Sequence, residues 1–247
     1  MNNRTLSAFA ITFLGMLAGC DASADRSVQP PAAPMDATVD TAANDTSDGK
    51  WQVLFDGTSL EHFRGFKQES MPGGWEILDG SLTRTGSGGD IITREQYDDF
   101  ELELEWKIQP NGNSGIFFNV AEEGYNSVWE TGPEMQVLDD ELHYDGKNRL
   151  TCAGSNYALH AAPEGVVHPA GQWNTVRLVL RGDAVEYWLN GTNVVSYQLQ
   201  SPEWKALVAG SKFRDMPDYG SRTSGHIALQ DHGDVVEYRN IRIRRLN

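Results

Sequence analysis

Strict alternation of apolar and charged residues constrains the fold of this chain more than any other feature. Over residues 100–107 the even positions are Phe, Leu, Leu and Trp, while the odd positions are three glutamates and a lysine. Successive side chains of a β-strand point to opposite faces, so a period of two predicts a strand with one buried face.

The same period recurs along the chain. Residues 175–180 alternate in this way, and the segments 185–189 and 194–199 flank Asn190-Gly191, a pair that favours a tight hairpin turn. Only 202–209 reads as a helix, with Pro202 near its start. Further strands are expected at Gln52–Phe55, Trp75–Leu78, Ile91–Ile92, Gly115–Asn119, Glu134–Leu138, His226–Gln230 and Ile241–Arg244. Many strands with glycine-rich turns and one short helix predict an all-β fold, a two-sheet antiparallel sandwich.

The first residues resemble a bacterial lipoprotein signal peptide. Arg4 precedes an apolar stretch, 6–17, which is too short to span a bilayer and ends in Leu17-Ala18-Gly19-Cys20. We therefore expect a signal peptide over 1–19, lipidation of Cys20, and export to the cell envelope, facing the periplasm or the exterior. An ordinary signal peptide that contains a cysteine is the alternative, and the choice of inner or outer membrane stays open.

Composition divides the rest of the chain in two. Residues 20–50 are rich in Ala, Asp, Ser, Thr and Pro and almost free of large apolar residues, which predicts a disordered acidic tether. From Trp51 to Asn247 aromatic and β-branched residues recur, which predicts one domain. If Cys20 carries lipid, only Cys152 remains, so no intrachain disulfide forms and Cys152 is expected to be a small buried residue.

The balance of charge limits the partners. With 35 acidic and 20 basic residues the formal net charge is −15, and no basic stripe offsets it. Such a chain repels phosphate backbones, so we expect no nucleic-acid binding and no membrane contact apart from the lipid. Neutral or polar ligands such as sugars fit this balance better.

Short motifs follow one another in a fixed order along the domain. They are Leu54–Gly57, Phe100–Leu102, Asn113–Phe118, Gly132–Asp139, Gly171–Asn174, Leu189–Gly191, Leu229–Gly233 and Arg239–Ile243. This ordered set resembles the 3-keto-disaccharide hydrolase family, whose fold is similar to the concanavalin A-like jelly roll. The resemblance covers essentially all of 51–247, and Phe63 departs from the Trp expected after the Phe-Asp-Gly opening.

The resemblance implies a hydrolase that cleaves 3-keto-glucosides or 3-keto-disaccharides. A ketone at C3 acidifies the hydrogen on C2. The β-elimination then needs a base for that proton, a group that holds the enolate oxygen, and an acid at the leaving oxygen. Water adds to the product of the elimination. A partner sugar 3-oxidoreductase would have to supply the oxidised substrate. A lectin-like carbohydrate-binding module and a conventional glycoside hydrolase with paired carboxylates are the alternatives.

Glu134 and Gln136 are the leading site residues. In the run 134–138, period two places these two on one face and Met135 and Val137 on the other, which we expect to face the core. We expect Glu134 to be the catalytic base and Gln136 to bind a sugar hydroxyl. A solvated strand glutamate is the alternative.

The motif Gln230-Asp231-His232-Gly233 ends the strand predicted at 226–230. His232 is expected to be the acid at the leaving group or a metal ligand, since its unperturbed pKa near 6.5 suits either direction of proton transfer. A histidine held at a strand end by packing is the alternative. Gln230 is expected to contact substrate.

Other polar and aromatic residues are candidates for sugar binding. Asn113 and Ser114 precede an apolar run and either donate to hydroxyls or cap the turn, and Asn119 alternates with Phe117. Aromatic rings in or near loops offer stacking surfaces or pack locally; these are Trp129, Tyr157 and Phe213.

Acidic residues crowd the loop after 134–138. The group comprises Asp139, Asp140, Glu141, His143 and Asp145, and such a group binds either Ca²⁺ through oxygens or a transition metal through the histidine. Its spacing fits no dedicated calcium loop, and a solvated acidic loop is the alternative. Asp139 and His143 are the expected ligands if a divalent metal is present.

Overall fold

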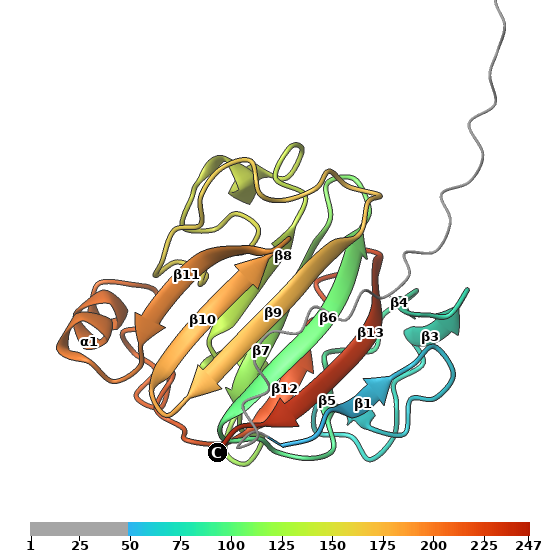
Figure 1. The fold of residues 1–247 in the computed structure, drawn as a ribbon, viewed down its shortest axis with the longest axis horizontal. Coiled ribbons are helices and arrows are strands. Elements are labelled where there is room, and N and C mark those ends of the chain that lie inside the picture. The colour runs from blue at the N-terminus through green and yellow to red at the C-terminus, as the bar shows by residue number, and fades with distance from the viewer. Residues whose placement is uncertain (1–48) are drawn as a thin grey trace, which may run out of the picture. The chain divides into compact units, whose positions relative to one another are not determined.

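A computed structural model describes residues 49–247, which form two antiparallel β-sheets packed face to face (Figure 1). The predicted signal peptide, Cys20 and almost all of the predicted tether lie outside the described residues. Within 49–247, no helix has both the length and the apolar character needed to cross a bilayer.

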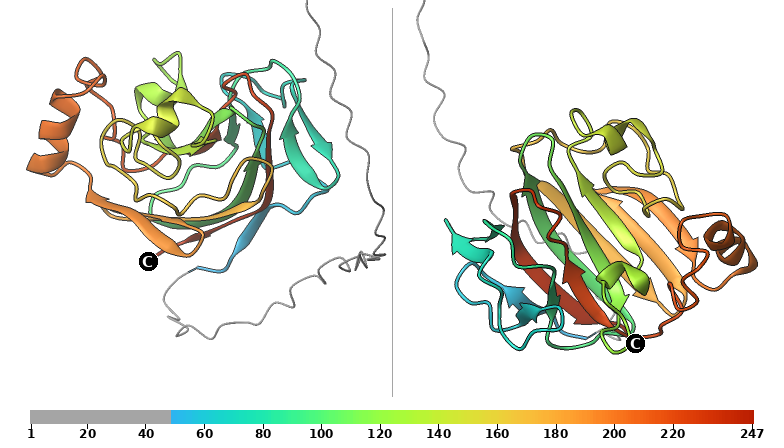
Figure 2. Two further views of the ribbon diagram at one scale, coloured as in Figure 1. Left: turned by 90° about the horizontal axis from the view of Figure 1, so that it is seen from above. Right: turned by 180° about the vertical axis from the view of Figure 1, so that it is seen from behind.

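The larger sheet, sheet A, has eight strands. Seven follow the order β11-β10-β9-β6-β13-β4-β3, and β1 also pairs with β13. Viewed from above, sheet A curves around one side of the smaller sheet (Figure 2). Its strands are β1 (Gln52–Phe55), β3 (Trp75–Leu78), β4 (Ser81–Arg84), β6 (Phe100–Ile108), β9 (Asn174–Arg181), β10 (Ala184–Leu189), β11 (Thr192–Gln198) and β13 (Val236–Arg245).

The smaller sheet, sheet B, has five strands in the order β2-β5-β12-β7-β8. Its strands come from distant parts of the chain. The central strand, β12, lies near the end of the sequence and pairs with β5 and β7, which come much earlier. The strands are β2 (Phe63–Gly65), β5 (Ile91–Thr93), β7 (Asn113–Val120), β8 (Glu134–Leu138) and β12 (His226–Leu229). Two 3₁₀ turns, η1 (Val128–Glu130) and η2 (Tyr144–Lys147), and one helix, α1 (Pro202–Ala209), complete the fold.

The two sheets meet over a core that is rich in aromatic rings. Phe118 of sheet B contacts Phe100 and Tyr187 of sheet A edge to face, at centroid distances of 6.2 and 6.4 Å. Burial of rings this large supplies most of the favourable free energy of such a sandwich, and edge-to-face contacts add specificity. Cys152 is buried, as expected.

The predicted all-β sandwich is confirmed, together with each predicted strand and the helix. Asn190 and Gly191 have φ of 48° and 77°, the left-handed values that a tight hairpin needs. Two strands were missed, β2 and β4. β2 has only three residues, too few to reveal a period, and β4 shows no alternation because all four of its residues are buried.

The outward glutamates of β6 form ion pairs across sheet A. Glu101 pairs with Arg177 and Arg244, Glu103 with Arg242, and Glu105 with Arg239. The outward face of sheet B differs, because loops cover it: Glu134 and Gln136 in β8 are both buried. A second apolar cluster lies on that face, formed by Ile92, Phe117, Val120, Val128 and Ala228.

Candidate active site

A row of polar residues crosses the outward face of sheet B. Gln136 in β8 is opposite Gly115 in β7, and the backbone N–H of Gln230 donates to the Gly115 carbonyl at 3.0 Å. On the other side of β12, the pairs Leu229–Ile91 and Ala228–Ile92 set the register, so Asp90 lies beside Gln230. Residues directly opposite on neighbouring strands point to the same face. Gln136, Gly115, Gln230 and Asp90, the polar row, therefore share one surface.

Glu134 lies beside this row and leans over it. It is opposite Phe117 and two residues from Gln136 along β8, and only 7% of its surface is exposed. A Cβ atom on Gly115 would lie 2.3 Å from the Glu134 Oε1, so the glycine leaves the space that the carboxyl group occupies. The predicted outward direction of Glu134 and Gln136 is confirmed, since Met135 and Val137 belong to the main core.

The surroundings of Glu134 change its acidity. Burial raises the pKa of the carboxyl group from 4.5 to about 8; the positive charge of Lys212 opposes this, and Asp90 and Asp145 add to it. Both protonation states are therefore populated near neutral pH. A side chain tuned in this way is suited to general acid–base catalysis.

Lys212, Tyr157 and Asp145 flank Glu134. The Lys212 Nζ lies 4.0 Å from the centroid of the Tyr157 ring, and the Tyr157 hydroxyl donates to the Asp145 Oδ2 at 3.4 Å. Burial lowers the pKa of Lys212, while Glu134 and Asp145 hold its charge. Sequence reasoning missed Lys212, because it follows no periodic pattern and its only signal was the neighbouring Phe213.

Several buried polar atoms around Glu134 lack hydrogen-bond partners. In the described part of the chain they include the side-chain oxygens of Asn113, Gln136, Gln230 and Ser155. Gln136 uses only its Nε2, which donates to the Thr151 carbonyl at 3.3 Å. A buried polar group left unpaired costs about 1–3 kcal/mol, so a concentration of such groups marks a place where water or a ligand supplies the missing partner.

Trp129, a predicted stacking residue, has an exposed side chain. It belongs to η1, whose Val128 packs against Phe117, the residue opposite Glu134. Its side chain is 41% exposed. An exposed ring can offer a stacking surface for a sugar, and this role of Trp129 stays a prediction.

Three predicted sugar-binding residues are placed elsewhere by the structure. Ser114 faces the core, where its Oγ donates to the Gln230 carbonyl and bonds the Tyr238 hydroxyl, each at 2.8 Å. Asn119 has a φ of 55° at an irregular end of β7, and its Nδ2 donates to the Arg222 carbonyl, which holds a loop. Phe213 is buried and stacked on Tyr219 at 3.9 Å, so its ring is not available as a platform.

His232 is exposed in the turn after β12, two residues beyond Gln230. The roles predicted for it stay predictions.

The predicted metal ligands accept hydrogen bonds from backbone amides. Asp139 accepts at both oxygens, from the Asn111 amide at 2.7 Å and from the Glu141 amide at 3.1 Å. His143 Nδ1 accepts from the Asp145 amide at 3.2 Å. Across residues 49–247, no three His, Cys, Asp or Glu side chains are grouped so as to hold a metal. These hydrogen bonds cap the turns of the acidic loop, and metal binding by Asp139 and His143 stays a prediction.

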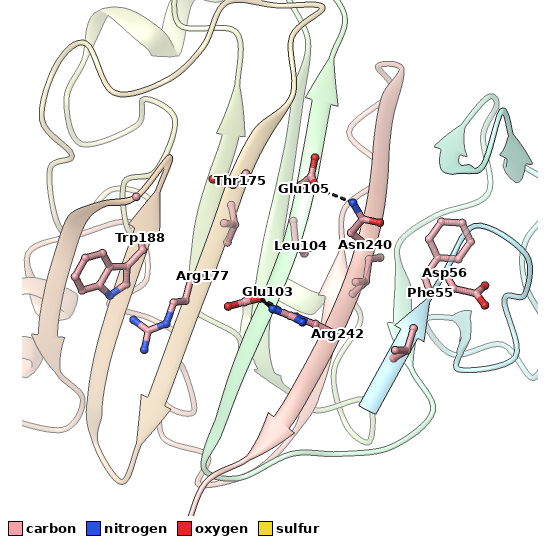
Figure 3. Close-up of a pocket in the computed structure, with 14 residues that line it drawn as sticks. Phe55, Asp56, Glu103, Leu104, Glu105, Thr175, Arg177, Trp188, Asn240 and Arg242 are labelled. Atoms are coloured by element: carbon pink, nitrogen blue, oxygen red, sulfur yellow. Dashed lines mark hydrogen bonds and ion pairs between the residues drawn. The ribbon is translucent and has the colours of Figure 1, made fainter. Parts of the chain in front are cut away.

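A groove on the outward face of sheet A was not predicted. It encloses about 650 Å³ and is lined by residues that include Glu103, Glu105, Trp188, Asn240 and Arg242 (Figure 3). Its polar side chains pair with one another: Asn240 donates to Glu105 at 2.6 Å and Arg242 to Glu103 at 2.7 Å. Because these groups already have partners, the groove lacks the unpaired buried atoms that surround Glu134.

Comparison with known proteins assigns the family. A family model described as a 3-keto-alpha-glucoside-1,2-lyase-like domain matches residues 50–244. The chain belongs to this family. The matched 3-keto-alpha-glucoside-1,2-lyase-like domain includes Glu134 and all four residues of the polar row.

Individual relatives agree with this assignment. A protein of Bacteroides thetaiotaomicron named 3-keto-disaccharide hydrolase is 33% identical over 226 residues, which cover 79% of this chain and 78% of the relative. The crystal structure of a candidate glycosyl hydrolase from Parabacteroides distasonis has a TM-score of 0.73 at 33% identity and covers 80% of this chain and 94% of its own. A galectin-like protein from Bacillus subtilis, with a TM-score of 0.50 at 13% identity over 81% of this chain and 98% of its own, shares the fold alone.

The raised pKa of Glu134 predicts a pH-dependent stability. The folded state keeps a proton that the unfolded chain releases above about pH 4.5, so the free energy of unfolding falls as pH rises toward about 8 and then levels off. Glu134→Gln removes this dependence, which amounts to about 1.4 kcal/mol per pH unit in that window. Urea unfolding at about pH 5 and about pH 8.5 should show the variant gaining stability relative to wild type at the higher pH.

Glu164 is exposed, so Glu164→Gln is the matched control and should track the wild type at both values. An equal difference between Glu134→Gln and wild type at the two pH values would mean that Glu134 ionises normally in the folded protein.

Proposed function

We propose that this protein cleaves 3-keto-glucosides or 3-keto-disaccharides by β-elimination followed by hydration. The observation that carries the proposal is a buried carboxyl group, Glu134, placed over Gly115 and surrounded by unpaired amide oxygens. The 3-keto sugar as substrate comes from the names of the family and of the Bacteroides relative.

The chemistry starts with the ketone at C3. A base takes the proton from C2, and the electron pair moves into an enolate whose negative charge lies on the C3 oxygen. The enolate collapses with cleavage of the bond between C1 and the leaving oxygen, which takes a proton from an acid. Water then adds to the unsaturated ketone at C1. Glu134, with both protonation states available near neutral pH, is suited to one of the two proton transfers.

Lys212 and Tyr157 are suited to stabilise the enolate. The ammonium group lies over the Tyr157 ring and interacts electrostatically with Glu134. A positive charge and a hydroxyl donor placed where negative charge develops lower the barrier, because they need no reorganisation during the reaction. Asn113, Gln136 and Gln230 would satisfy their unpaired oxygens by accepting from sugar hydroxyls.

The non-catalytic alternative explains less. A module that only binds sugar gains nothing from a buried carboxyl group with a raised pKa, since burial of that group lowers stability at neutral pH. Trp129 and the unpaired amides suit binding and catalysis equally, so the Glu134 environment favours an enzyme.

The test compares 3-keto-trehalose with trehalose on the purified protein, with and without chelator. We expect release of 3-keto-glucose from the oxidised sugar alone, and loss of that release with chelator would point to a metal that takes part in the reaction. Equal cleavage of both sugars would point to a conventional glycoside hydrolase, and binding without cleavage would point to a carbohydrate-binding module.

The chemistry and the N-terminal motif lead to two further proposals. Because 3-keto sugars arise by oxidation, an oxidoreductase acting at C3 of a glycoside should supply the substrate. Because Leu17-Ala18-Gly19-Cys20 resembles a lipobox, the enzyme should work from the cell envelope through lipid on Cys20.

A further inference from the structure

Asp90 faces the same surface as Glu134 and has no role in the mechanism above. It directly precedes β5, whose Ile91 packs in the main core and whose Ile92 packs in the outward cluster. Alternation along the strand therefore directs Asp90 outward. In the polar row it is the neighbour of Gln230.

Asp90 is anchored through one oxygen and presents the other. The Asp231 amide donates to its Oδ1 at 2.9 Å, and within residues 49–247 its Oδ2 has no hydrogen-bond partner. Asp231 is itself fixed, since it accepts from the Gly88 and Gly89 amides at 3.0 and 2.9 Å and from Arg84 at 2.6 Å. The carboxyl group of Asp90 is thus held on a rigid turn with one oxygen available.

The spacing of the strands sets the distance between the two carboxyl groups. Asp90 and Gly115 are two strands apart, about 10 Å at the backbone, and the Glu134 carboxyl group lies over Gly115. Gln230, with its unpaired oxygen, lies between them. The two carboxyl groups therefore lie on opposite sides of Gln230.

We propose that Asp90 is the second proton-transfer residue of this site and works opposite Glu134 across the ring bound over Gln230. The inference rests on the proposed function, because it assigns a group to the second of the two proton transfers that elimination requires.

The electrostatics decide which residue has which role. Burial raises the pKa of Asp90 to about 6, with the Asp231 charge adding to it and the Asp231 amide opposing it; Glu134 lies at about 8. Near neutral pH Asp90 is therefore mostly ionised and Glu134 mostly protonated. When their environments separate the pKa values of two carboxyl groups, the group with the lower pKa is suited to be the base and the other to be the acid. Asp90 takes the C2 proton and Glu134 protonates the leaving oxygen, which reverses the role expected for Glu134 from the sequence.

The charges that face this pair are those of Lys212, Asp145, Asp231 and Arg84. Arg84 pairs with Asp231 at 2.6 Å, and Lys212 lies on the Glu134 side, where it opposes the rise in pKa. Neither cation removes the difference between the two carboxyl groups.

The protons balance over the full reaction. Asp90 accepts the proton from C2 as the C2–H electrons move toward C3, and the C1–oxygen bond breaks with transfer of the Glu134 proton to the leaving oxygen. Water then attacks C1 and gives its proton to the Glu134 carboxylate, while Asp90 returns its proton to C2. One water is consumed, and both residues return to their starting states.

The test uses two substrates that differ in leaving group, the 3-keto derivatives of methyl glucoside and of 4-nitrophenyl glucoside. Asp90→Asn should lose about 100-fold or more on both, because loss of the base affects every substrate. Glu134→Gln should lose as much on the methyl substrate but less than about 10-fold in the first-turnover release of 4-nitrophenolate, whose departure needs no acid. The first turnover is measured because Glu134 also takes the proton from water in the later hydration step. Asp183, which is exposed in the β9–β10 turn, gives the control Asp183→Asn.

A second readout follows exchange of deuterium at C2 of 3-keto-glucose with solvent, which needs the base and no cleavage. Asp90→Asn should lose this exchange and Glu134→Gln should keep it. Asp90→Asn with wild-type exchange and cleavage, or loss of exchange in Glu134→Gln alone, would overturn the inference while leaving the proposed function standing. A wild type that neither cleaves nor exchanges would overturn both.

Discussion

Glu134→Gln is expected to lower kcat on 3-keto-trehalose by about 10³-fold with little change in substrate affinity. The amide keeps the size of the side chain but neither accepts nor donates the required proton, and the sugar leaving group of trehalose needs an acid. Steady-state kinetics with binding measured by calorimetry would check both parts. A variant that binds as wild type and turns over normally would show that Glu134 takes no part in proton transfer.

Gly115→Ala is expected to displace the same carboxyl group without removing it. The added Cβ would lie 2.3 Å from the Glu134 Oε1 and 2.9 Å from the Phe117 Cε2, so Glu134 must move. Because it is the end of a side chain that gives way, we expect a stability cost of only about 1–3 kcal/mol. A shift of about 1 Å in a reacting group costs about 100-fold in rate, and kcat/KM should fall by that order.

Gly73 provides the matched control for this substitution. A Cβ on Gly73 meets no atom within 4 Å, so Gly73→Ala should leave both melting temperature and kcat/KM unchanged. Full activity in a folded Gly115→Ala variant would contradict the placement of Glu134 as a determinant of rate.

Local pattern was sufficient to predict much of the fold. Alternation is imposed by the pleat of each strand, so β6, β9 and β10 are legible without any knowledge of their neighbours. The same rule gave the outward direction of Glu134 and Gln136. It also excludes Ser114: Asn113 and Ser114 are adjacent in β7 and face opposite sides, so only Asn113 reaches the outward surface.

The rest of the site depends on pairing between distant segments, which local pattern does not encode. Asp90 joins Glu134 only because β5 pairs with β12 and β12 with β7. Asn119 lies next to a register shift near His226, where the two-residue period breaks, so alternation from Phe117 does not set its direction. Lys212 reaches Glu134 from a loop whose course follows from tertiary packing alone.

The strand order of sheet B also determines when the candidate active site is completed during synthesis. The polar row takes Asp90 and Gly115 from the first half of the domain, Gln136 from its middle and Gln230 from near the end of the chain. Since β12 separates β5 from β7, a ribosome-bound chain that lacks the last few dozen residues has a gap at the centre of this sheet. Catalytic activity is therefore a property of the finished chain, and its appearance during refolding should report closure of the slow, long-range β12 pairings rather than formation of the early local hairpins.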